Sequence, residues 1–96
     1  MDKIELRGKK IVELISQFIL GDVNCDINYD FHYFTFGIYN GPHGWNWRGD
    51  ISDVMHMSPN ECAWEICITY RDWVLDTYFR NKYLEDLLLS RKEQPL

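Results

Sequence analysis

The chain has 96 residues and a formal net charge of −5 at pH 7. Apolar and aromatic residues make up 46% of it, which is enough for one hydrophobic core and too little for two. With 3 Pro, 6 Gly and no low-complexity run, the composition excludes a disordered or fibrous chain. We therefore expect residues 1–96 to form a single domain.

The first periodic segment runs from Lys9 to Leu20. Its apolar residues recur at the spacing of one helix face, at Ile11, Leu14, Ile15 and Phe18. Gly21 follows the last apolar residue, a position where glycine readily adopts the left-handed conformation that ends a helix. The sequence therefore predicts an amphipathic N-terminal helix.

Between Val23 and Tyr33 the apolar residues alternate with polar ones, which is typical of a strand with one buried and one solvated face. The alternation slips at Phe34, which indicates a bulge or a bend into a second strand. Turn-forming residues at 40–44 predict a hairpin. Beyond it the alternation resumes at Trp45, Trp47, Gly49 and Ile51. These signals predict a small antiparallel sheet of two or three strands between Val23 and about Val54.

Ser58, Pro59 and Glu61 have the spacing of a helix N-cap, a first helical residue and a capping-box acid. The strand-like composition of residues 62–70 leaves a strand as an alternative there. A helix is favoured because the polar residues form one stripe at helical spacing and would scatter over both faces of a strand. That stripe consists of Glu61, Glu65, Thr69, Asp72 and Asp76.

The polar residues at 80–82 interrupt this pattern, so we expect either a kink or a second, shorter helix after them, and a frayed tail at residues 92–96. The predicted fold class is α+β, with an N-terminal helix, a small antiparallel sheet and a long C-terminal helix packed on the sheet.

The acidic residues are concentrated in the middle of the chain. Residues 11–79 contain ten acids and two bases, whereas both ends carry an excess of Lys and Arg. Because such a field repels phosphate, direct nucleic-acid binding is disfavoured and a basic protein partner is expected. A plain solvated surface remains the simpler interpretation of the charge count.

The sequence contains no pattern that indicates catalysis or metal binding. Three cysteines are an odd number for a disulfide framework, so we expect reduced thiols in a cytoplasmic protein. Gly21 opens a segment similar to a calcium loop, but Ile27 and Tyr33 occupy its required Gly and Glu positions. No phosphate-binding loop, nucleophile elbow or zinc-ligand spacing occurs. We expect no enzyme, no cofactor, no metal and no membrane span.

These features favour a small acidic binding protein that neutralises a protein partner by covering a basic, nucleic-acid-binding surface. Toxin-immunity proteins and phage anti-defence inhibitors share that surface character. The expected contact residues are six acids that steer association and two tryptophans that anchor it: Asp22, Asp26, Asp30, Glu65, Asp72, Asp76, Trp45 and Trp47.

Two alternatives remain open. One is a small-molecule or metal-binding domain with a pocket formed by Trp45, Trp47 and His43. The other is a structural subunit, in the simplest case a homodimer, that meets a second chain through its aromatic residues.

Overall fold

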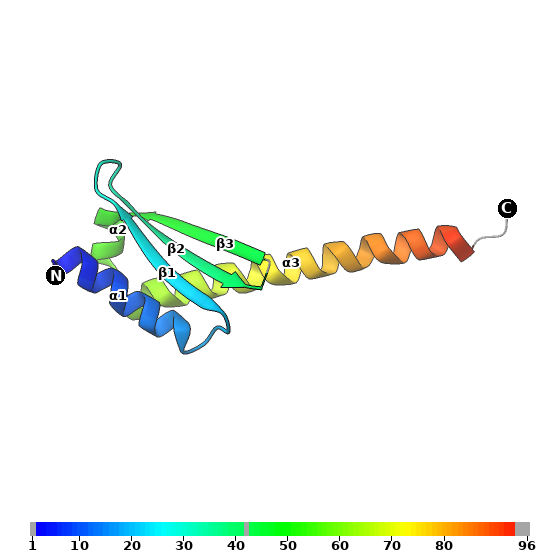
Figure 1. Cartoon of the computed structure of the whole chain (residues 1–96), viewed down its shortest axis with the longest axis horizontal. Coiled ribbons are helices and arrows are strands. Elements are labelled where there is room, and N and C mark those ends of the chain that lie inside the picture. Colours follow the sequence, from blue (N-terminus) through cyan, green and yellow to red (C-terminus); the bar gives the residue numbers. More distant parts are fainter. Residues whose placement is uncertain (1, 42, 94–96) are drawn as a thin grey trace.

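The structure is a computed structural model that describes residues 2–41 and 43–93, with the side chains of residues 2–41 and 44–82. It confirms the α+β fold with an N-terminal helix, a three-stranded antiparallel sheet and a long C-terminal helix (Figure 1). The elements follow in the order α1 (Lys3–Ser16), β1 (Asp22–Asn28), β2 (Tyr33–Asn40), β3 (His43–Asp50), α2 (Ile51–His56) and α3 (Pro59–Glu93).

The sheet has one face toward the helices and one face toward solvent. Its strand order is β1-β2-β3, and Cys25, Phe36 and Trp47 stand opposite one another across it. The side chains on the same face as these three residues point inward. Among them, Phe34, Phe36 and Ile38 are buried against apolar residues of α1 and α3. Helices α1 and α3 contribute Ile11, Ile15, Cys62, Ala63 and Ile66 to this core. On the outer face, Asp22, Asn24 and Asp26 of β1 and Asn46, Arg48 and Asp50 of β3 are exposed.

Helix α1 differs from the predicted range of 9–20. It begins at Lys3 because the Asp2 carboxylate caps it, with Oδ1 accepting a hydrogen bond of 2.7 Å from the Glu5 backbone N–H. Gly8 therefore lies inside the helix, where a Cβ atom would stand 2.8 Å from Cys25 Sγ. The missing side chain lets α1 approach the sheet closely. The helix ends at Ser16, so Gly21, with a φ of 121°, belongs to the loop before β1 instead of forming the helix cap.

The prediction of one strand from Val23 to Tyr33 was wrong, because residues 29–32 form the turn between β1 and β2. The Phe31 backbone N–H donates to Asn28 Oδ1 at 2.9 Å, and His32 has a left-handed φ of 64°. Since the chain reverses here, the slip in the alternation marks a hairpin and not a bulge. The predicted hairpin at 40–44 is confirmed, with Asn40 paired to His43.

The sheet ends at Asp50, and the short helix α2 replaces the predicted strand residues up to Val54. Asp50 caps α2 by accepting a 2.8 Å hydrogen bond from the Ser52 backbone N–H. Ile51 and Val54 are buried on the inner side of α2, so they close one end of the core.

Helix α3 starts as predicted, with the Glu61 backbone N–H donating to Ser58 Oγ at 3.1 Å. Residues 62–70 are helical, so the strand alternative is excluded. The polar residues at 80–82 do not end the helix, since α3 continues as a single helix to Glu93. The predicted tail is helical at 92–93, and residues 94–96 lie outside the described part of the chain.

The C-terminal part of α3 extends well beyond the sheet (Figure 1). The molecule measures 66 × 28 × 21 Å, and its radius of gyration is 17.9 Å. A compact domain of this length would have a radius of gyration of about 12 Å. Within the described residues, no helix combines the length and hydropathy needed to cross a bilayer.

Candidate functional site

The six acids predicted to contact a partner are divided between two sides of the sheet. Asp22 and Asp26 lie on the exposed outer side of β1, and Asp30 lies in the turn that follows that strand. Glu65, Asp72 and Asp76 are exposed on α3, which packs against the inner face. The structure therefore brings Asp22 and Asp26 together and separates them from the helix acids by the thickness of the sheet.

The helix acids are also partly balanced by basic neighbours. Arg71 contacts Asp72 at 3.1 Å, and Arg80 contacts Asp76 at 2.9 Å. These exposed pairs contribute little to stability, but they reduce the local negative charge that a partner would meet. Among the side chains that the structure describes, neither Asp22 nor Asp26 forms an ion pair.

The outer sheet face combines acids with tyrosines. We define it by the outward residues of the three strands, which are Asp22, Asn24, Asp26, Asn28, Tyr33, Thr35, Gly37, Tyr39, Gly44, Asn46, Arg48 and Asp50. The Tyr39 ring lies over Gly37 and Gly44, where a Cβ atom would stand 2.8 Å from ring carbons. Arg48, the one base on this face, stacks over the Tyr33 ring at 4.2 Å.

Trp45 and Trp47 lie on the inner face and pack against the core. The Trp45 ring stands 5.4 Å from the Tyr70 ring, and the Trp47 ring stands 6.1 Å from the Phe36 ring. Since these rings are half-buried and engaged within the chain, they do not form the exposed anchor or the pocket rim expected from the sequence. The side chain of His43 lies outside the described part of the structure.

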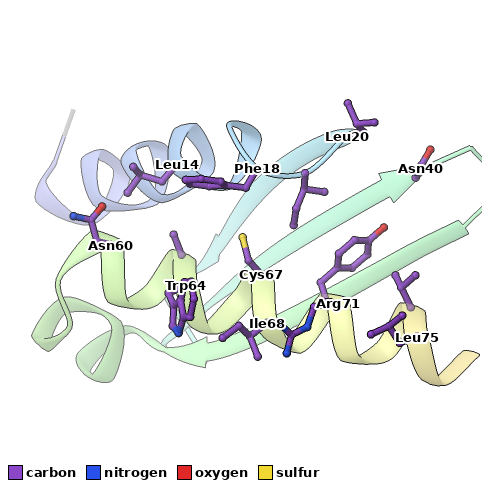
Figure 2. Close-up of a pocket in the computed structure, with 14 residues that line it drawn as sticks. Leu14, Phe18, Leu20, Asn40, Asn60, Trp64, Cys67, Ile68, Arg71 and Leu75 are labelled. Atoms are coloured by element: carbon purple, nitrogen blue, oxygen red, sulfur yellow. The ribbon is translucent and has the colours of Figure 1, made fainter.

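An apolar groove that the sequence analysis did not identify runs between the end of α1 and the side of α3 (Figure 2). It has a volume of about 820 Å³. On one side of the groove, Phe18 is 77% exposed and Leu20 is 87% exposed. On the other side, Trp64 is 70% exposed. Trp64, Ile68 and Leu75 recur at helical spacing and form a second apolar stripe on α3. This stripe is the sequence signal from which the groove could have been predicted.

The three cysteines are free and poorly suited to nucleophilic chemistry. Loss of hydration by burial raises the pKa of Cys25 from 9.0 to about 11 and that of Cys62 from 9.0 to about 12, and it also raises the pKa of Cys67. The reactive species of cysteine is the thiolate, which is scarce at neutral pH when the pKa is this high.

These shifts predict that the folded chain loses stability as the pH rises above about 9. A thiol whose pKa is raised by folding holds its proton more tightly in the folded state. Its stabilising contribution is complete below the unfolded pKa of 9.0 and is lost as the pH rises toward 11 for Cys25 and 12 for Cys62. Urea unfolding at pH values of about 8 and about 10.5 measures the effect. Cys62→Ala should reduce the difference, and an unchanged difference would contradict the assignment.

Within the described residues, no group of three or more His, Cys, Asp or Glu side chains is arranged to hold a metal ion. Comparison with protein-family models, curated proteins and solved structures gives no significant match to this chain. The interpretation of its function therefore depends on the two surfaces described above, the outer sheet face and the apolar groove.

Proposed function

We propose that this chain is a small, non-enzymatic binding protein that neutralises a basic protein by covering a positively charged surface with its outer sheet face. The observation that carries the proposal is the exposed sheet face with Asp22 and Asp26, which no basic side chain neutralises within the described structure. The three free thiols fit a reducing compartment, so the proposed location is the cytoplasm.

Electrostatic attraction would act mainly on the rate of association. Asp22 and Asp26 project from the same side of an edge strand and stand about 13 Å apart along it. Arg48 is held over Tyr33 instead of next to either acid. A partner that presents Lys or Arg at a similar spacing would be drawn to this face, and salt would weaken the attraction.

Aromatic residues other than the two tryptophans are available to anchor such a contact. Tyr39 lies flat on the outer face and is 40% exposed. Phe31 is 77% exposed in the turn that also contains Asp30. Rigid aromatic side chains commonly supply the largest contributions to protein interfaces, because they bury a large area with few rotors. We therefore place the anchor at Tyr39 and Phe31.

The test compares two variants with the same change in net charge. Asp22→Asn, Asp26→Asn and Asp30→Asn neutralise the sheet side, and Glu65→Gln, Asp72→Asn and Asp76→Asn neutralise the helix side. A basic protein captured by the wild-type chain from cells of its source, and then purified, should bind the sheet-side variant about 10- to 100-fold more weakly. Biosensor kinetics at low and high salt should show the loss mainly in the association rate.

The helix-side variant is the matched control and should retain most of the affinity. Partner binding that survives the sheet-side changes and is lost with the helix-side changes would overturn the proposal. Binding that is insensitive to salt would contradict the electrostatic mechanism.

A further inference from the structure

We infer that the apolar groove receives the α3 helix of a second copy of this chain, so that two chains form a symmetric dimer with antiparallel α3 helices. This inference concerns the helix side of the molecule and does not depend on the function proposed for the outer sheet face. It rests on exposed area, on the length of the protruding helix and on the distribution of charge along α3.

The chain exposes more surface than a compact protein of its size. Its accessible area is 7258 Å², whereas a folded monomer of 11.6 kDa is expected to expose about 5,800 Å². The excess of about 1,400 Å² exceeds the roughly 800 Å² that each partner buries in a stable interface of standard size. A dimer through the groove and the helix would bury this surplus.

The exposed surface is apolar where the helix leaves the sheet. Val74 and Leu75 at the end of the groove are 39% and 45% exposed, and Tyr78 and Phe79 one turn further are 60% and 63% exposed. A helix derives most of its stability from packing an apolar face, and short isolated helices are marginal in water. The protruding part of α3 therefore requires a packing partner.

The groove and the protruding helix have matching lengths. The groove follows α3 from Asn60 to Leu75, about 22 Å, and the helix continues from there to Glu93, about 27 Å. If two α3 helices cross antiparallel near Asp76, the segment 77–92 of each chain lies level with residues 60–75 of the other. A single two-fold axis therefore places the protruding segment of each chain along the groove of the other, as a self-complementary interface requires.

The charges along α3 favour the antiparallel arrangement. The segment 59–79 contains four acids and one base, whereas the segment 80–93 contains four bases and three acids. Antiparallel helices place the acidic segment of each chain beside the more basic segment of the other and also oppose the helix dipoles. A parallel pair would place like charges together.

Sedimentation equilibrium of the full chain at about 1 to 100 μM tests the association. The wild type should have twice the mass of one chain. Trp64→Glu combined with Leu75→Glu should raise the dimer dissociation constant by about 100-fold or more, because both changes place a carboxylate in the contact. Leu6→Glu is the matched control: Leu6 is 53% exposed on α1 and does not line the groove, so this variant should remain dimeric.

The orientation is tested by a spin label at position 93, introduced as Glu93→Cys with Cys67→Ala to remove the least shielded native thiol. Pulsed electron resonance should give an interlabel distance of about 50 Å in the antiparallel dimer, and a parallel pair would give less than about 20 Å. A short distance, or a wild-type chain that sediments as a monomer throughout the range, would overturn the inference. A small apolar ligand bound by that monomer would assign the groove to a ligand instead.

Discussion

Replacing Ile66 with aspartate is expected to unfold the chain, whereas the same replacement at Ile68 is expected to leave it folded. Ile66 has 0% exposure and lies among core residues of α1 and the sheet. A carboxylate there would have to be desolvated without a partner or remain protonated, and either outcome costs several kcal/mol. Ile68 lines the open groove, where a carboxylate keeps contact with water. Far-UV circular dichroism and urea unfolding measure both outcomes.

This pair of variants also tests the direction in which α3 presents its side chains. Residues two apart lie on the same face of a strand and on different faces of a helix. Similar loss of folding in both variants would contradict the helical placement of residues 62–70. Because Ile68 lies in the proposed dimer contact, its variant should unfold cooperatively as a monomer.

Truncating Phe36 to alanine is expected to destabilise the folded state by about 3–5 kcal/mol. Phe36 has 0% exposure at the centre of the inner sheet face. Its ring centroid lies 5.7 Å from that of Phe34 and 6.1 Å from that of Trp47, so removal leaves a cavity beneath both helices. The urea midpoint should fall strongly, with little change in the slope of the transition.

Phe31→Ala is the matched control, because it removes the same atoms from a side chain that is 77% exposed. Its effect on the free energy of unfolding should stay within about 0.5 kcal/mol. The same variant should weaken the binding of the proposed basic partner, since Phe31 is one of the two proposed anchors. Equal destabilisation by the two variants would show that Phe36 is not the centre of the core.

Local signals in the sequence were sufficient for the elements that depend on neighbouring residues. Ser58 and Glu61 gave the start of α3, because a helix cap is formed by groups within one turn. The alternation of Val23, Cys25 and Ile27 predicted their inward orientation in β1, because the side-chain period of a strand is fixed. These signals also gave the α+β class.

The turn at residues 29–32 and helix α2 were not predicted, because they depend on contacts with residues far away in the sequence. The alternation continues through Tyr29 and Phe31, yet the chain turns there because Asn28 closes the turn and β2 must pair with β1. Helix α2 forms where an extended continuation was predicted, since Ile51 and Val54 are buried at the end of the core in that conformation. In both segments, burial in the tertiary structure outweighed the local preference for an extended strand.

By itself, the sequence determined which segments are amphipathic, where α3 begins and how many acids the chain carries. Only the tertiary structure decided that the acids lie on two sides of the sheet, that Trp45 and Trp47 face the core, and that α1 and α3 leave an apolar groove between them. The reason is physical: periodicity gives each side chain a direction relative to its own helix or strand. The packing of one element on another decides which of those directions face water.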